Sequence, residues 1–186
     1  MIGLVLAGGK SSRFGQDKAL YRYPNQKANN VEVTVNKLLM VCNHVLISTN
    51  TQNYSVIKRQ FSHLNNVDVI VDQEPFKQHG PLSGIYAASC QNPQTTDYLL
   101  VAVDYPLLSP SVISIIASNP NSYAATPKNS HYAISHFQVS KRTLHDYLLF
   151  GDFRLSHFII DSRRCLPISF PSYQSFLNLN SPEVQS

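Results

Sequence analysis

The feature that most constrains this chain is a glycine-rich segment directly after its first apolar run. The run Ile2–Leu6 is short and apolar, which is typical of a buried strand. The glycines of the following segment, Ala7–Lys18 (AGGKSSRFGQDK), let backbone N–H groups come close to an anion. Arg13 and Lys18 add two cationic side chains. We therefore predict a loop that holds a triphosphate at the carboxyl end of the first strand.

Two well-known phosphate-binding patterns do not fit this segment. The Walker pattern requires four residues between its first glycine and Gly-Lys-Ser/Thr. Here Gly9-Lys10-Ser11 is preceded by Gly3, which is one residue too far away and lies inside the predicted strand. The dinucleotide pattern G-x-G-x-x-G is absent because Gly8 and Gly9 are adjacent. The structural alternative is a glycine and serine turn that carries two solvated basic residues.

Strand-like and helix-like patterns alternate along most of the chain. Such alternation predicts an α/β fold with a three-layer α/β/α, Rossmann-like architecture and a mostly parallel sheet. The length fits one domain over 1–186, with a nucleotide-binding part at about 1–108 and an acceptor-binding part at about 109–186. We predict strands at 2–6, 45–48, 67–71, 98–103, 123–126, 133–139 and 166–170, and helices at 31–42, 54–61, from 81, 110–117, 141–149 and 155–160.

Two aspartates follow predicted strands. Asp72 comes directly after the third strand and Asp104 directly after the fourth. Ligands of open parallel sheets bind at the carboxyl ends of the strands, where the glycine-rich loop also lies. Because Mg²⁺ prefers oxygen ligands and uses one or two carboxylates together with substrate phosphates, we predict a magnesium site with Asp104 as the better ligand. The alternative for Asp72 is a helix cap or a solvated loop position.

Composition excludes several classes of function. The net charge of +4 suits an anionic ligand, but the basic residues form no run of the kind that binds nucleic acid. No apolar stretch is long enough to span a membrane, and the first apolar run is too short for a signal peptide. Three widely spaced cysteines, Cys42, Cys90 and Cys165, fit reduced thiols. We expect a cytoplasmic protein that binds neither nucleic acid nor membrane.

The histidines carry weaker signals. His131 and His136 are five residues apart on a predicted strand, which would place them on opposite faces, so we expect no metal pair. His79 precedes Gly80-Pro81, where a helix is predicted to begin, and we expect an exposed surface position, with contact to a substrate as the alternative.

The glycine-rich segment also resembles a family signature. Its pattern Leu-Ala-Gly-Gly-x-Ser-x-Arg-x-Gly-x-Asp-Lys is similar to that of the molybdenum cofactor guanylyltransferases, nucleotidyltransferases of the glycosyltransferase-A-like superfamily. The resemblance extends to Asn50 after the second strand, to Asp72, and to the Asp-x-Pro-Leu that begins at Asp104. Three further segments resemble the family, namely Gly80–Gly84, Gly151–Leu155 and Asn178–Glu183.

This resemblance implies transfer of GMP from GTP to the terminal phosphate of molybdopterin, with release of pyrophosphate. The implied catalytic residues are Arg13, Lys18 and Asp104, with Mg²⁺ on Asp104. The amides of residues 7–10 and Arg13 would hold the β- and γ-phosphates. The implied nucleotide-binding residues are Leu6, Ala7, Gly8, Gly9, Lys18, Asn50, Asp72, Pro81, Leu82, Gly84 and Asp104, and the implied acceptor-binding residues are Arg154, Asn178 and Asn180. The resemblance further implies transient contact with other cofactor-biosynthesis proteins or a molybdoenzyme chaperone.

The chain departs from the family pattern at Ala102-Val103, Tyr105 and Ser181, and in two longer stretches. Residues 21–37 match nothing specific, and residues 128–133 lack the expected Gly and Pro-Leu on the acceptor side. Two alternatives therefore remain: a related cytidylyl- or sugar-phosphate nucleotidyltransferase, and a relative that binds a nucleotide without turnover.

Overall fold

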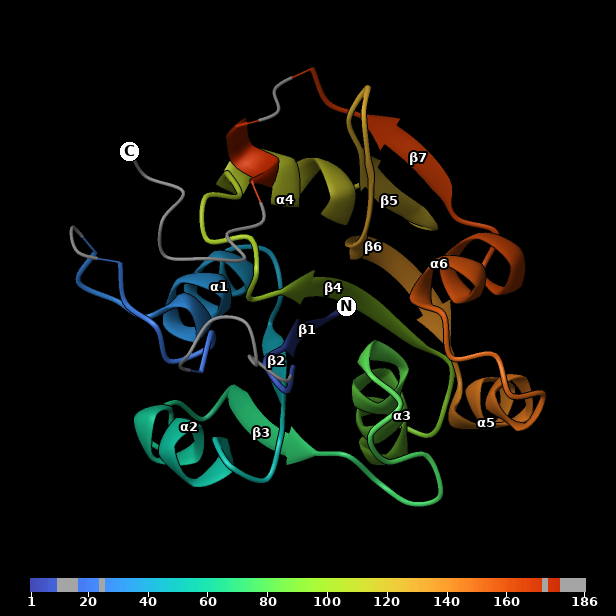
Figure 1. The fold of residues 1–186 in the computed structure, drawn as a ribbon, viewed down its shortest axis with the longest axis horizontal. Helices are drawn as coiled ribbons and strands as arrows, with labels where there is room; N and C mark the ends of the chain where they lie inside the picture. The colour runs from blue at the N-terminus through green and yellow to red at the C-terminus, as the bar shows by residue number, and fades with distance from the viewer. Residues whose placement is uncertain (10–16, 24–25, 172–173, 178–186) are drawn as a thin grey trace.

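The computed structural model describes residues 1–9, 17–23, 26–171 and 174–177. Within these ranges the strands form one seven-stranded sheet with helices on both faces (Figure 1). The strands are β1 (Ile2–Leu6), β2 (His44–Thr49), β3 (Val67–Val71), β4 (Thr96–Ala102), β5 (Ser122–Ala125), β6 (Ser130–Val139) and β7 (Leu166–Ser169). The helices are α1 (Asn30–Leu39), α2 (Tyr54–Gln60), α3 (Pro81–Gln91), α4 (Pro110–Ala117), α5 (Lys141–Leu149) and α6 (Leu155–His157), with a π-helix η1 (Phe158–Ser162) and a 3₁₀-helix η2 (Gln174–Phe176).

The strand order is β3-β2-β1-β4-β6-β5-β7. The first four strands run parallel, and Leu6 at the end of β1 is level with Ser48 of β2 and Ala102 of β4. β6 is antiparallel to both β4 and β5, whereas β7 is parallel to β5. The prediction of an α/β fold with a mostly parallel sheet is confirmed, and the carboxyl ends of β1 to β4 lie at one edge.

Alternate residues of the central strands face two separate cores. Val5 and Ile47 pack in one core with residues of α1, α2 and α4. Leu4 and Leu46 pack in the other core with residues of α3, α5, α6 and η1. Because β1 is buried on both faces, its sequence is a continuous apolar run. The three-layer α/β/α arrangement therefore follows from the pleat of the strands.

Local capping sets several helix starts where the sequence predicts them. Ser109 precedes Pro110 of α4 and accepts a hydrogen bond from the N–H of Val112. Ser140 caps α5 in the same way, and Asn29 caps α1. No helix among the described residues is long and apolar enough to cross a membrane.

The structure corrects the prediction for the two histidines of β6. The register between β5 and β6 shifts, so that Tyr123 pairs with Ser135 but Ala124 pairs with His131. This bulge changes the alternation of side chains, and both histidines face the core that contains α4. His136 is held by the carbonyl of Ile116 and by Asp97, which is a structural role.

The predicted helix at 155–160 differs from the structure in type. Its first turn is the α-helix α6, and the following residues form η1. Phe158 and Ile159 of η1 are buried against the sheet.

Candidate functional site

An ion pair lies beside the end of β1. Lys18 Nζ is 3.6 Å from Asp104 Oδ1, and both side chains are largely enclosed, with 19% and 32% of their surfaces exposed. Gly8 and Asp104 each follow, by two residues, the level where Leu6 pairs with Ala102. Because β1 and β4 are neighbours in the sheet, the glycine-rich segment and Asp104 are brought together at its carboxyl edge.

The backbone around Lys18 is fixed to the start of α1. Asn30 Nδ2 donates to the carbonyl of Lys18 at 2.9 Å, and the N–H of Val31 donates to the carbonyl of Ala19 at 2.9 Å. On the preceding side, Asp17 Oδ1 accepts from the N–H of Ala19 at 2.8 Å. The backbone on both sides of Lys18 is therefore fixed by hydrogen bonds, and the side chain extends from it to Asp104.

A second lysine holds the segment that follows Asp104. Lys37 of α1 donates to the carbonyl of Pro106 at 2.7 Å. Its partial burial lowers the pKa of its ammonium group to about 8. Tyr23 also lies near this segment: burial, followed by the charges of Tyr21 and Asp104, raises its pKa to about 12. Tyr23 therefore stays protonated at neutral pH.

Three of the predicted phosphate-binding residues, Ala7, Gly8 and Gly9, are among the described residues and follow β1 directly. The N–H of Ala7 donates to the carbonyl of Ser48 at 2.8 Å, so its predicted role as a phosphate donor is wrong. Amide donors in the described part of this segment would come from Gly8 and Gly9. A Cβ atom on Gly8 would lie 3.1 Å from the backbone of Thr49, whereas one on Gly9 would meet nothing within 4 Å.

The segment before α3 has a glycine-dependent turn. Gly80 has a φ of 69°, a conformation that favours glycine, and Pro81 occupies the first turn of the helix. Ser83 Oγ accepts from the N–H of His79 at 2.7 Å. Gly84 has a packing role, because a Cβ atom there would overlap Ser48 Oγ and lie 2.9 Å from Leu6 Cδ2. Leu82 is fully buried in the core between α3 and the sheet.

Asn50 and Asp72 are both held by local hydrogen bonds. Asn50 Oδ1 accepts from the N–H groups of Gln52 and Asn53. Asp72 Oδ2 accepts from the N–H of Gln78 at 3.0 Å, while burial raises the pKa of its carboxyl group.

Asp72 and Asp104 follow strands that are not neighbours. β2 and β1 separate β3 from β4, and three strand spacings amount to about 14 Å. Asp72 and Asp104 therefore cannot share one cation, which corrects our interpretation of them as a carboxylate pair.

Arg154 lies on a segment that contacts the loop before α3. Its guanidinium donates twice to Asp152, at 3.1 and 3.2 Å, and these bonds hold the pKa of that carboxyl group below its usual range. The ring of the adjacent Phe153 stacks on His79 with centroids 3.9 Å apart. The other predicted acceptor residues, Asn178 and Asn180, and the predicted catalytic Arg13 lie outside the described residues.

Sequence reasoning missed Asn30, Lys37 and Asn53. Asn53 Nδ2 donates both to the carbonyl of Ala7 and to Asp17 Oδ2. No motif marks Asn30 or Lys37, because their partners are distant in sequence. The Asn-x-x-Asn spacing of Asn50 and Asn53 is typical of a helix start but does not predict the contact with Asp17.

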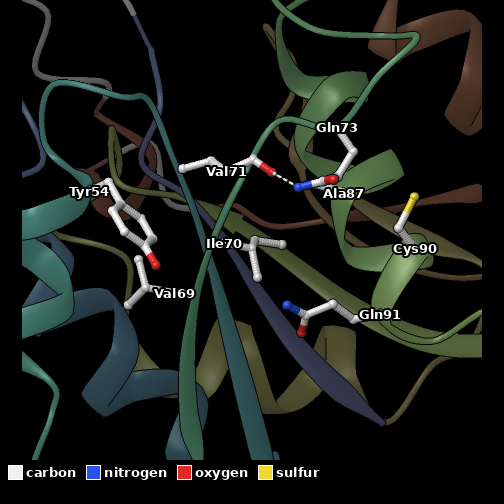
Figure 2. A pocket seen from close by; sticks show the side chains of 8 residues that line it. All are labelled: Tyr54, Val69, Ile70, Val71, Gln73, Ala87, Cys90 and Gln91. Carbon is white, nitrogen blue, oxygen red and sulfur yellow. Dashed lines mark hydrogen bonds between the residues drawn. The ribbon is translucent and has the colours of Figure 1, made fainter.

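A pocket of about 370 Å³ lies beside the edge strand β3 (Figure 2). Gln73 points across its rim and donates to the carbonyl of Val71 at 3.1 Å. None of its lining side chains carries a charge, so the pocket is unsuited to a triphosphate; they are Tyr54, Val69, Ile70, Val71, Gln73, Ala87, Cys90 and Gln91.

Asp104 offers a hard oxygen ligand of the kind that Mg²⁺ binds. Among the residues that the structure describes, no three histidine, cysteine, aspartate or glutamate side chains come together. One carboxylate beside the predicted phosphate-binding segment nevertheless fits Mg²⁺, which takes most of its remaining ligands from substrate phosphates and water.

Comparison with solved structures supports the fold. A nucleotidyl transferase from Methanothermobacter superposes with a TM-score of 0.70 at 17% identity, over 97% of this chain and 92% of that one. The protein Rv0371c from Mycobacterium tuberculosis gives a TM-score of 0.61 at 16% identity, over 92% and 88%. A protein from Aquifex aeolicus gives 0.61 at 21% identity, over 95% and 91%.

The sequence also matches a family model. The match covers residues 3–159, and the family is described as the MobA-like NTP transferase domain. These residues include all of β1 except Ile2, the glycine-rich segment, Lys18 and Asp104. The fold, the arrangement at the end of β1 and the family match agree, and the chain belongs to the MobA-like NTP transferase family, a family of nucleotidyltransferases.

Proposed function

We propose that this protein transfers GMP from GTP to the terminal phosphate of molybdopterin and releases pyrophosphate. The observation that carries the proposal is the Lys18–Asp104 pair at the sheet edge where Gly8 and Gly9 follow β1. A triphosphate would be bound by cationic side chains and N–H donors, and a metal ion held beside it would need a carboxylate ligand. This edge of the sheet provides all three.

The proposed chemistry depends on positioning rather than on a covalent intermediate. The acceptor phosphate is already an anionic nucleophile, so no general base is required. Lys18 would stabilise the negative charge that develops at the α-phosphate. The amides of Gly8 and Gly9, together with Arg13, would hold the β- and γ-phosphates. Mg²⁺ held by Asp104 would neutralise charge on the α-phosphate and the pyrophosphate leaving group.

The choice of GTP and molybdopterin rests on the sequence resemblance. Asn50, Asp72 and the Gly80–Gly84 segment would contact the guanosine, although Gly84 and Leu82 act through packing. Arg154, Asn178 and Asn180 would bind the acceptor. The stack between His79 and Phe153 supports this division, because it places the Arg154 segment against the loop that precedes α3.

The three cysteines are unpaired in the structure, which suits a protein of the reducing cytoplasm. Cofactor-biosynthesis proteins or a molybdoenzyme chaperone would deliver its substrate or receive its product.

Pyrophosphate release tests the proposal. We would assay GTP and CTP separately, each with Mg²⁺ and molybdopterin, for the wild type, Asp104→Asn and the control Asp68→Asn. Asp68 is an exposed aspartate of β3 that pairs with His44. We expect release from GTP alone, abolished by Asp104→Asn and retained by Asp68→Asn. Release from CTP alone would establish a cytidylyltransferase, and binding of GTP without release would indicate a non-catalytic relative.

A further inference from the structure

We propose that Asn53 is a positioning residue that joins the two ends of the phosphate-binding segment and thereby sets the place of Lys18. This inference rests on the proposed function for its effect on turnover. We call the hydrogen bonds from Asn53 to Ala7 and Asp17 the clamp, and all three residues are among those that the structure describes.

The side-chain amide of Asn53 bridges two segments that flank residues 8–16. Its Nδ2 donates to the carbonyl of Ala7 at 2.9 Å and to Asp17 Oδ2 at 2.9 Å. The partners are 46 and 36 residues away in sequence, and Asn53 is only 2% exposed. A buried amide that gives both of its hydrogens to oxygen acceptors is fully used as a donor. One side chain therefore determines how far apart the two ends of the segment lie.

Asn53 is itself rigidly held at the start of α2. Its Oδ1 accepts from the N–H of Asn50 at 3.2 Å, while Asn50 Oδ1 accepts from the N–H of Asn53 at 2.9 Å. These reciprocal bonds fix the orientation of the amide, so that Nδ2 faces Ala7 and Asp17. The end of β2 thereby supports the loop that follows β1.

The clamp acts on Lys18 through Asp17. One oxygen of Asp17 accepts from Asn53 and the other accepts from the N–H of Ala19, so the carboxylate holds the backbone on both sides of Lys18. Lys18 Nζ in turn meets Asp104. Without the bond from Asn53, Asp17 would lose its link to β1 and α2, and the ammonium group would lose a defined position relative to the α-phosphate.

Substitutions at two positions separate this role from general stabilisation. Asn53→Asp keeps the size and the acceptor for Asn50, but it replaces the donor with a carboxylate facing Asp17. Adding Asp17→Asn places an amide at position 17 that donates to the new carboxylate, although the bond to Ala7 is not restored. The matched control is Thr49→Val, which removes a buried hydrogen bond from Thr49 Oγ1 to the carbonyl of Ile70 nearby.

We would measure kcat and KM for GTP in the pyrophosphate assay, and binding of fluorescent GTP and CTP analogues without acceptor, at a temperature where all variants are folded. We expect Asn53→Asp to lower kcat/KM about tenfold to a hundredfold, because a displacement of a catalytic group by about 1 Å can cost about a hundredfold in rate. The double variant should have a kcat/KM at least threefold higher than that of Asn53→Asp. Thr49→Val should lower thermal stability with unchanged kcat.

Two results would overturn the inference: a double variant no better than Asn53→Asp, or a loss in Asn53→Asp no larger than in Thr49→Val. If the wild type binds nucleotide but releases no pyrophosphate, the proposed function fails, and the clamp is then judged on binding alone. Weakened binding in Asn53→Asp with partial recovery in the double variant supports it. Equal binding by all variants refutes it.

Discussion

Replacing Lys18 by methionine should separate the stability of the site from its chemistry. The Lys18–Asp104 pair is 3.6 Å long and partly exposed, so it contributes about 1 kcal/mol to folding. The bonds to the Lys18 backbone from Asn30 do not involve its side chain and remain in Lys18→Met. The folded structure should therefore change little, and the ammonium group alone is lost.

The expected kinetic effect is much larger. An ammonium group that meets charge developing at the α-phosphate acts mainly on the transition state, so its removal should lower kcat about a hundredfold to a thousandfold, or about 3 to 4 kcal/mol. KM for GTP should rise less than tenfold, because in the proposed mechanism Gly8, Gly9 and Arg13 would still hold the other phosphates.

The assay is steady-state pyrophosphate release, with the dissociation constant of GTP measured separately and unfolding followed in urea. Lys58→Met is the control, since Lys58 is an exposed lysine of α2 that contacts Tyr54. Weaker GTP binding with unchanged kcat would refute the catalytic role of Lys18. A loss of unfolding free energy of several kcal/mol would refute the structural reasoning.

Three further predictions concern other parts of the site. Gly84→Ala should destabilise the protein by about 1–3 kcal/mol, because the added methyl group would overlap Ser48, and this cost outweighs the helix preference of alanine. Urea unfolding measures the change, and a stabilised variant would contradict the packing role of Gly84. Lys37 has a folded pKa of about 8, below its ordinary value of 10.5, so the unfolded chain binds more protons between these values and wild-type stability should rise from pH 8 to pH 10. After allowance for solvent screening, the rise relative to Lys37→Met should be about 1–2 kcal/mol, and parallel pH profiles of unfolding free energy for the two proteins would disprove it. Arg154→Ala should raise KM for the acceptor without changing the dissociation constant of GTP; equal losses for both substrates would remove Arg154 from the acceptor side.

Local interactions made many elements predictable from the sequence. The bounds of β1, β3, α4 and α5 agree with their predictions, because apolar runs and the caps Ser109 and Ser140 act over a few neighbouring residues. β6 begins three residues earlier than predicted, since its first part pairs with β5 across a bulge that no local pattern encodes.

The sequence by itself determined the fold class, the glycine-rich segment and the candidates Lys18 and Asp104. Tertiary structure decided which of these residues meet. The strand order places Asp104 beside the end of β1, whereas Asp72 follows β3, three strand spacings or about 14 Å from β4, a separation that depends on pairing between distant strands. The bond between Asn53 and Asp17 likewise exists only because β1 and β2 are neighbours in the sheet. Propensity and capping act locally, whereas the geometry of the site depends on contacts that form only when distant segments pack together.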